Sequence, residues 1–410
     1  MKINTFLFIL AATLVCKVSA EKSKYPPCSS TKNVILVDND VNLGYENGKI
    51  CTIGSVASSL KRRGNGNGNG KGNGNGSGNG KGNGNGNGNG KGNGNGNGNG
   101  NGNGNGNGNG NGNENGKGKG HNSKWSRYMD KIEITNICPA NYIVKMEGKV
   151  YPEPVKVHYY STTTETERPM NVVLPLGYNK SKKYPVLYYL HGIMCDEDTM
   201  LVEDMGAIAT YQHLLDEQKV KEMIIVTPFQ YAPAPGTEVP PTLDQSYYDG
   251  YDNFINDLIN DIMPYMEQHY SILKGRENTA IYGFSMGGRN SIYIGYTRSD
   301  LFGYVGATAP APGVTEAQDM VSYHKGLLQP EELVAEYQPI VSLIAGGTND
   351  TVVGTFPKEY HELLETNHQK HVWYEIPGAD HDLTSITTGF YNFIKTLFGV
   401  LNEKRKKNKN

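Results

Sequence analysis

The sequence predicts an α/β protein in which helices cover both faces of a mainly parallel sheet. Beyond residue 150, short runs rich in β-branched and aromatic residues alternate with amphipathic stretches, as expected for repeated strand–helix units. One of these runs leads through Gly283-Phe284-Ser285-Met286-Gly287 into a helical pattern. A strand, a sharp turn and a helix in that order are typical of a large α/β domain with its site at the carboxyl ends of the strands.

Eight runs are predicted strands, and two amphipathic stretches between and after them are predicted helices. The stretch 254–266 has apolar side chains on one helical face and Asn or Asp on the other, with a kink expected near Pro264. A last helix is expected at 387–397. The predicted strands are 155–160, 170–174, 186–190, 223–227, 279–282, 304–307, 340–345 and 372–376.

A run of alternating Gly and Asn at 64–120 divides the 410-residue chain, which contains 52 Gly. The run has no apolar residues that a strand could bury, so we expect a flexible tether. Only the long segment after it can bury a large core. The expected division is a signal peptide at 1–20, a small Cys-containing module at 21–63, the tether at 64–120, the α/β domain at 121–401 and a basic tail at 402–410.

The N-terminus predicts a secreted protein. Lys2 precedes a short apolar stretch that ends in Val18-Ser19-Ala20, the pattern of a cleaved leader. No later segment is apolar enough to anchor the chain in a membrane. The formal net charge of −2 gives no cationic field, so neither nucleic acid nor an anionic membrane is an expected partner.

Cysteine usage fits an oxidising compartment. Cys16 leaves with the leader, and the tether separates Cys28 and Cys51 from Cys138 and Cys195. The simplest pairing is a disulfide within each half, Cys28 with Cys51 and Cys138 with Cys195. For the second pair a different interpretation stays open, because a large domain can bury an unpaired cysteine as a small apolar residue.

No metal and no cofactor are expected, because two metal-like patterns are incomplete. The acidic segment 38–40 resembles the start of a calcium loop, but Gly44 is one position late and Lys49 stands where a bidentate Glu belongs. His361 and Glu362 open a zinc-like helix motif, but Glu365 replaces its second histidine and His368 does not restore the spacing.

Ser285 is the candidate nucleophile. Its strand-to-helix turn exposes a strained serine, and glycine is required at 283 and 287, where side chains would collide with neighbouring backbone. This is the nucleophile elbow of the α/β-hydrolase fold. In that fold an acid and then a base follow the serine along the chain.

His381 is the expected base and Asp350 the expected acid, because each lies in a loop that follows a predicted strand. Asp319 and Asp382 are alternative acids, whereas Asp380 adjoins the base and is badly placed to reach it. The backbone N–H groups of Ile193 and Met286 are the expected oxyanion donors, because Ile193 lies in the His191-Gly192-Ile193 loop and Met286 follows the nucleophile. His191 is expected to hold its loop rather than to act as a second base.

These motifs together resemble carbohydrate esterase family 1, a group similar to esterase D that includes feruloyl and acetyl xylan esterases. The matching stretches cover nearly all of 150–398, and the resemblance extends to an anaerobic gut fungus enzyme through the small module and tether. The resemblance implies a secreted serine esterase that cleaves feruloyl esters on plant cell-wall arabinoxylan. The blocks that carry it are 184–192, 261–265, 283–288, 346–350 and 377–381.

Several questions stay open at this stage. Acetyl xylan esterase is the main alternative activity, and a serine peptidase, an acyltransferase and a non-catalytic binding module rank lower. The small module is expected to bind carbohydrate or another protein.

The segment 228–251 contains many Pro and Tyr residues and little periodicity, so it forms either a roof over the acyl pocket or a surface loop. Its candidate acyl-binding residues are Tyr231, Tyr247, Tyr248 and Tyr251. Of two glycosylation sequons, only Asn179 is expected to carry a glycan, because the second, at Asn349, includes the candidate acid.

Overall fold

The computed structural model describes residues 125, 127–320 and 322–402, together with three short strands near the N-terminus. These strands, β1 (Leu36–Asp38), β2 (Val41–Glu46) and β3 (Lys49–Ile53), pair antiparallel in the order β1-β2-β3. The expected leader, the tether and the expected Cys28–Cys51 disulfide lie outside the described residues, as does the tail beyond 402.

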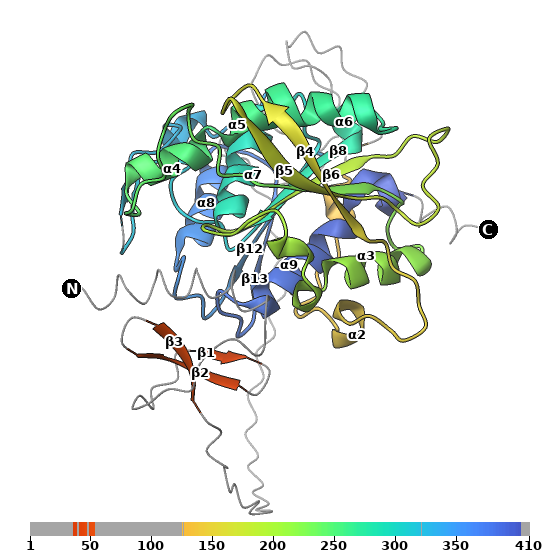
Figure 1. The fold of residues 1–410 in the computed structure, drawn as a ribbon, viewed down its shortest axis with the longest axis horizontal. Helices are drawn as coiled ribbons and strands as arrows, with labels where there is room; N and C mark the ends of the chain where they lie inside the picture. The colour runs from red at the N-terminus through yellow and green to blue at the C-terminus, as the bar shows by residue number, and fades with distance from the viewer. Residues whose placement is uncertain are drawn as a thin grey trace, which may run out of the picture.

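The main domain is built on an eight-stranded sheet in the order β13-β12-β9-β8-β6-β7-β5-β4 (Figure 1). Strands β4 and β5 form an antiparallel hairpin, β5 also runs antiparallel to β7, and the other neighbours are parallel. Its strands are β4 (Pro154–Ser161), β5 (Thr166–Val173), β6 (Val186–Leu190), β7 (Ile224–Pro228), β8 (Thr279–Phe284), β9 (Tyr304–Thr308), β12 (Val341–Gly347) and β13 (Val372–Ile376).

All eight predicted strands of this sheet are confirmed, two of them to the residue. The central strand β6 is buried at every position, as expected for a parallel strand covered on both sides. Leu187 and Tyr189 face one hydrophobic core, whereas Tyr188 and Leu190 face the other, because successive side chains of a strand alternate.

Helices form a layer on each face of the sheet (Figure 1). One core contains buried side chains of α3 (Ala207–Asp216) and α9 (Leu383–Ile394). The other contains side chains of α7 (Met286–Thr297), α8 (Phe356–Thr366) and the helical segment that begins at Phe254. The predicted α/β architecture with helices on both faces is therefore confirmed.

The predicted helix at 254–266 is present, but it changes its winding along its length. It comprises α5 (Phe254–Asp257), a π-helical turn η4 (Leu258–Ile262) and α6 (Met263–His269). Pro264 lies in the first turn of α6, where a missing backbone N–H costs little. The π turn contains more residues per turn than an α-helix and ends shortly before the proline. At the place where a kink was expected, the structure therefore has a change of helix type.

Two other expectations about helices were incomplete. The segment 228–251 lacks helical periodicity, yet α4 (Gln245–Asp252) forms at its end. Asp244 caps this helix by accepting a hydrogen bond from the Ser246 N–H, and the helix contacts α5 and α7. The last helix begins at Leu383, four residues earlier than predicted, because the Asp382 carboxylate caps it.

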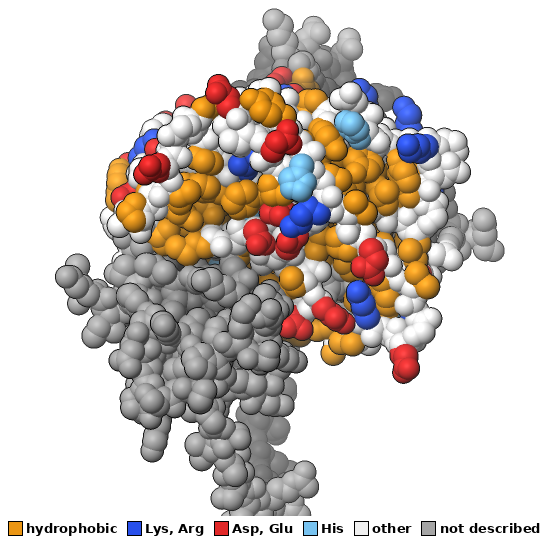
Figure 2. Space-filling view, viewed as in Figure 1, with side chains coloured by type: hydrophobic (Ala, Val, Ile, Leu, Met, Phe, Trp, Pro, Cys, Tyr) orange, Lys and Arg blue, Asp and Glu red, His pale blue; other side chains and the backbone are white. Residues whose placement is uncertain are grey.

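Short elements complete the main domain. They are the helix α2 (Ala140–Ile143), the hairpin β10 (Ala317–Gln318) and β11 (Tyr323–His324), and the 3-10 turns Met129–Lys131, Thr199–Leu201, Glu203–Met205, Arg276–Asn278, Pro330–Glu332 and Leu397–Gly399. Within the part of the chain that the structure describes, no helix combines the length and apolarity needed to cross a bilayer. Acidic and basic side chains are interspersed on the face shown in Figure 2.

The expected disulfide between Cys138 and Cys195 is wrong. Cys138 is a free, buried cysteine, whereas Cys195 is disulfide-bonded. Cys138 lies against α9, where its backbone N–H donates to the Thr388 hydroxyl at 3.0 Å. Cys195 lies in the loop after β6, beside Gly192. The alternative interpretation, a cysteine buried as a small apolar residue, describes Cys138.

Candidate active site

Ser285 occupies a strained turn between β8 and α7. Its φ of 57° and ψ of −120° lie outside the regions that most residues adopt. A Cβ atom at Gly283 would collide with the backbone of Gly287, and one at Gly287 would collide with the carbonyl oxygens of Leu190 and His191. Both glycines are therefore required for the helix to pack this closely on the sheet.

Backbone hydrogen bonds hold this turn in place. The Ser285 N–H donates to the Thr308 carbonyl at 3.1 Å, and the Ser285 carbonyl accepts from the Ala311 N–H at 3.0 Å. Thr308 ends β9, the strand next to β8. The neighbouring strand therefore fixes the serine in a backbone conformation that would otherwise be unfavourable.

Asp350 and His381 meet at the ends of neighbouring strands. His381 Nδ1 donates to Asp350 Oδ2 at 2.8 Å, and both side chains are buried. The second oxygen, Asp350 Oδ1, accepts the backbone N–H groups of Val352 at 2.9 Å and Val353 at 3.0 Å. With Nδ1 protonated in this way, neutral His381 presents an unprotonated Nε2 that can accept a proton.

The same contacts keep Asp350 ionised. Burial raises the pKa of its carboxyl, but the adjacent His381 and the two backbone donors outweigh burial and hold the pKa below its usual value. The His381 ring packs on the Phe284 ring with a centroid separation of 4.4 Å. Phe284 immediately precedes Ser285, so this contact brings the imidazole beside the strand that carries the serine.

The alternative acids have other partners. Asp319 accepts a hydrogen bond from His324 Nε2 at 2.9 Å, in a second buried Asp–His pair between β10 and β11. Asp382 caps α9 by accepting from the Ser385 N–H at 3.1 Å. Asp380 accepts the backbone N–H of His381 itself at 2.8 Å. Asp350, by contrast, accepts its hydrogen bond from the His381 imidazole.

The loop after β6 lies directly beside the serine. A Cβ atom on Gly192 would stand 3.6 Å from the Ser285 Cβ atom, so the following residue, Ile193, is close to the nucleophile. Met286 is the first residue of α7, so its N–H has no acceptor within the helix. The two expected oxyanion donors therefore come from adjoining backbone segments.

His191 has the structural role expected from the sequence. Its Nδ1 donates to the Gly192 carbonyl at 2.7 Å, and its Nε2 accepts the Gln230 N–H at 3.0 Å. Burial lowers the pKa of His191 to about 4, which keeps the imidazole neutral. The histidine thus joins the loop after β6 to the loop after β7.

Two amides that sequence reasoning missed complete this connection. Gln230 hydrogen-bonds the His191 carbonyl through Nε2 and accepts from Asn290 Nδ2 at 3.0 Å through Oε1. Asn290 Nδ2 also donates to the Tyr251 carbonyl at 3.2 Å. The position of Asn290, five residues after Ser285 on α7, is the sequence signal that could have identified it.

The four candidate tyrosines form one aromatic cluster next to the same loop. Tyr231 stacks on Tyr247 at 5.1 Å and meets the edge of Tyr251 at 5.2 Å. The Tyr251 hydroxyl accepts the Met194 N–H at 2.9 Å, one residue beyond Ile193. Tyr231, Tyr248 and Tyr251 are buried, whereas Tyr247 is only half-buried. Tyr247 is therefore the member of the cluster with the most exposed ring.

Arg289 and Asp252 fix this cluster to the nucleophile helix. The buried Arg289 Nη1 pairs with Asp252 Oδ1 at 2.6 Å, which joins α7 to the end of α4. Arg289 Nη2 also donates to the Gly313 carbonyl at 2.9 Å. The tyrosine-bearing helix is thus held by the same helix that begins at the nucleophile.

Comparison with known proteins assigns the family. The Esterase family model matches residues 161–401, a range that includes the turn around Ser285 and the loops that carry Asp350 and His381. A solved CE1 ferulic acid esterase of the anaerobic fungus Anaeromyces mucronatus is 60% identical, with a TM-score of 0.64. The match covers 66% of this chain and 100% of that one. The chain belongs to this esterase family and, within it, to carbohydrate esterase family 1.

A second structure of the same enzyme and one further relative set this match in context. The same Anaeromyces enzyme, solved in complex with ferulic acid, is 61% identical and covers 66% of this chain and 100% of its own, with a TM-score of 0.64. An endo-1,4-beta-xylanase/feruloyl esterase of Xylanibacter ruminicola is 26% identical over 162 residues, 37% of this chain. That segment spans only 20% of the Xylanibacter protein, so the similarity concerns one part of a larger enzyme.

Proposed function

We propose that the protein is a secreted feruloyl esterase that hydrolyses hydroxycinnamoyl esters of plant cell-wall arabinoxylan. The proposal rests on the buried Asp350–His381 pair, whose imidazole packs on Phe284, the residue before Ser285, in a chain 60% identical to a ferulic acid esterase. A leader of the secretory type at residues 1–20 supports an extracellular location. Secretion predicts that the mature chain begins at Glu21, which N-terminal sequencing of the secreted protein can test.

In the first half of the reaction, Ser285 Oγ attacks the ester carbonyl while His381 Nε2 takes the hydroxyl proton. The carbonyl oxygen becomes an oxyanion, which we expect the backbone N–H groups of Ile193 and Met286 to stabilise. Collapse of the tetrahedral intermediate breaks the bond to the sugar oxygen, which receives the proton from His381. The acyl group is left as an ester on Ser285.

In the second half, water replaces the sugar. His381 accepts a proton from the water as its oxygen attacks the acyl-enzyme, and it returns that proton to Ser285 Oγ when the acid leaves. Asp350 stays ionised, because its contacts hold its pKa low. The carboxylate fixes the Nδ1–H tautomer and stabilises the imidazolium that forms in each half.

The tyrosine cluster supports an aromatic acyl group over acetate. A feruloyl group is a flat phenol, and tyrosine rings can stack on it with little loss of conformational entropy. Tyr247 offers a half-exposed ring, and Tyr251 joins the cluster to the loop that carries Ile193. An acetyl group is too small to use such a surface, which is the basis for ranking acetyl xylan esterase second.

Release of ferulate and acetate from one wheat arabinoxylan sample tests the substrate. We expect ferulate to be released and acetyl groups to remain, and the reverse would favour an acetyl xylan esterase.

The Ser285→Ala variant tests the nucleophile. Its kcat for ferulate release should be lower by about 10⁶ with the fold retained, because the variant keeps only substrate binding and oxyanion stabilisation. Ser271→Ala serves as the matched control, and activity of Ser285→Ala within tenfold of wild type would refute the nucleophile.

A further inference from the structure

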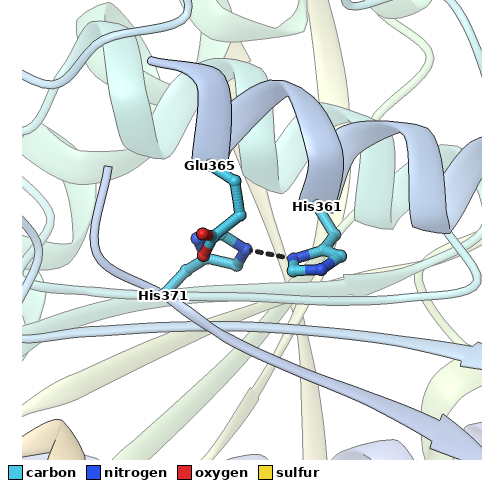
Figure 3. Close-up of side chains that lie close together, drawn as sticks. All are labelled: His361, Glu365 and His371. Carbon is cyan, nitrogen blue, oxygen red and sulfur yellow. Dashed lines mark hydrogen bonds between the residues drawn. The ribbon is translucent and has the colours of Figure 1, made fainter. Parts of the chain in front are cut away.

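Two histidines and a glutamate meet between α8 and β13, outside the candidate active site (Figure 3). His361 and Glu365 are four residues apart on α8, so they share one face of the helix. His371 immediately precedes β13. One ligand-type atom from each of the three side chains lies within 4.8 Å of the others. From this geometry, we propose that His361, Glu365 and His371 form a binding site for a divalent transition metal such as Zn²⁺.

The donor atoms suit zinc. Imidazole nitrogen and carboxylate oxygen are common Zn²⁺ ligands, and two of them bound to one tetrahedral ion stand about 3.4 Å apart. His361 Nδ1 and His371 Nε2 face each other at 2.8 Å, with the Glu365 carboxylate beside them. A small widening of this gap places an ion between the two nitrogens, and three protein ligands leave a fourth position for water.

The tautomer of His371 is already set for binding. Its Nδ1 donates to the Gln369 carbonyl at 2.7 Å, which leaves Nε2 with a lone pair directed at His361. Gln369 is itself fixed, because its N–H donates to the Leu364 carbonyl at 2.8 Å and its side-chain oxygen accepts the Ala335 N–H at 3.1 Å. A metal-binding histidine usually has such a backbone partner on its other nitrogen.

Binding of the ion requires a change of tautomer at His361. Because His371 Nε2 accepts, His361 Nδ1 is the donor in the hydrogen bond between the two rings. The ion takes the place of this proton, which moves to His361 Nε2 and leaves the Nδ1 lone pair for the metal.

The site lies where an ion would stabilise the edge of the sheet. Strand β13 is at one end of the strand order, so within the described residues it pairs with β12 alone. The proposed ion joins the start of β13 to α8. The loop that carries His381 follows the other end of this five-residue strand, about 16 Å from its start. We therefore assign the metal a structural role rather than a role in ester hydrolysis.

Zinc titration of the untagged, chelator-treated enzyme tests the proposal. Calorimetry should give one Zn²⁺ per chain, and Zn²⁺ at about 100 times its Kd should raise the melting temperature by about 5 °C. His371→Asn and Glu365→Gln should each weaken binding at least tenfold. His368→Asn, a matched change in the same connection that leaves the ligands intact, should bind Zn²⁺ as wild type does.

A second readout locates the ion. The His361 ring stacks on Trp373 at 5.5 Å and 7°, and the chain has only two tryptophans. Zinc should change the tryptophan emission of wild type but not of Trp373→Phe, which still binds the ion by calorimetry. Absence of saturable binding in wild type, or equal affinity in His371→Asn and wild type, would overturn the proposal. Ferulate hydrolysis should have the same kcat with and without Zn²⁺.

Discussion

Asp350 Oδ2 and His381 Nδ1 lie 2.8 Å apart, although 31 residues separate them along the chain. Their strands, β12 and β13, are parallel neighbours, so the loops at the two carboxyl ends meet at one edge of the sheet. The second oxygen of Asp350 is held by two backbone N–H groups of its own loop. These N–H groups fix the Asp350 carboxylate, and the carboxylate in turn fixes the orientation of the His381 imidazole.

Asp350→Asn should lower kcat for methyl ferulate by roughly 10⁴, because the amide would support the wrong imidazole tautomer while the fold persists. Asp319→Asn is the matched control, since Asp319 also holds a buried histidine, His324, but belongs to a different loop. We expect that control to keep most of its activity. A larger loss in Asp319→Asn than in Asp350→Asn would reassign the acid.

The carboxylate of Asp261 predicts a loss of stability in acid. It is buried in the π turn and accepts hydrogen bonds from the Thr162 hydroxyl at 2.6 Å and the Thr163 hydroxyl at 2.8 Å. Burial raises its pKa, but the hydrogen bonds from Thr162 and Thr163 outweigh burial, so the pKa in the folded state lies below 3.8. The ionised carboxylate therefore stabilises the fold at any pH above the pKa that Asp261 has in the unfolded chain. This stability is lost as the pH falls through the lower pKa of the folded state.

Asp261→Asn should therefore reduce the free energy of unfolding at pH 7 by about 1–3 kcal/mol, because an amide cannot accept as many hydrogen bonds. The difference from wild type should shrink as the pH falls from 5 to 2. Urea unfolding across this range measures both effects, with the exposed Asp300→Asn as the control. A difference that stays constant with pH would show that the ionised carboxylate does not supply the stability.

The sequence could predict the sheet and the candidate catalytic loops because both depend on local signals. Short β-branched runs with turn residues at their ends give the strands, and strand order then brings Asp350 to His381. Helix α4, in contrast, lacks apolar periodicity and depends on the Asp244 cap and on packing against α5 and α7. Its helical state therefore required the tertiary structure.

Contacts between distant segments account for what the sequence did not predict. Gln230 contributes through bonds to His191 and Asn290, and none of these residues is close to another along the chain. Likewise, Glu365 seemed to break a zinc-like motif because the third ligand-type residue, His371, belongs to the connection after the helix. The predicted disulfide between Cys138 and Cys195 was wrong for the same reason, because positions along the chain do not show which cysteines are close in space.

The thiol of Cys138 should be unreactive in the native enzyme. Burial raises its pKa to about 12, so almost no thiolate is present at pH 8. We expect Ellman's reagent to leave Cys138 unlabelled in buffer and to label it in denaturant without reductant. Peptide mapping should find the label on Cys138 only after denaturation, and Cys138→Ser should remove that label. Rapid labelling of Cys138 in the native protein would contradict its buried position.

Glycosylation of Asn179 stays a prediction, and the structure leaves the Asn179 side chain accessible. Asn179 is exposed, and its side-chain oxygen accepts the Ser181 hydroxyl at 2.9 Å within the sequon. Asn349 is also exposed, but its backbone N–H donates to the Ala379 carbonyl at 2.9 Å beside the candidate acid. Glycopeptide mass spectrometry of active enzyme should find sugar on Asn179 alone, and full occupancy of Asn349 would count against Asp350 as the acid.

The most exposed ring of the tyrosine cluster separates the feruloyl and acetyl hypotheses. Tyr247→Ala should lower kcat/KM for methyl ferulate by about tenfold or more, since an aromatic pair contributes roughly 0.5–1.5 kcal/mol beyond the area it buries. Tyr247→Phe keeps the ring and should retain most of the activity. Small acetate esters should be hydrolysed equally by wild type and both variants, because acetate does not reach the ring.

Three further alanine variants, at Tyr231, Tyr248 and Tyr251, complete this experiment, and the exposed Tyr160→Ala is the control. A uniform loss on ferulate and acetate would mean that the cluster only supports the Met194 loop, through the Tyr251 hydroxyl. No loss on either substrate at any of the four positions would refute stacking of the acyl ring. In that case nothing in the cluster would favour an aromatic acyl group, and acetyl xylan esterase would become the leading hypothesis.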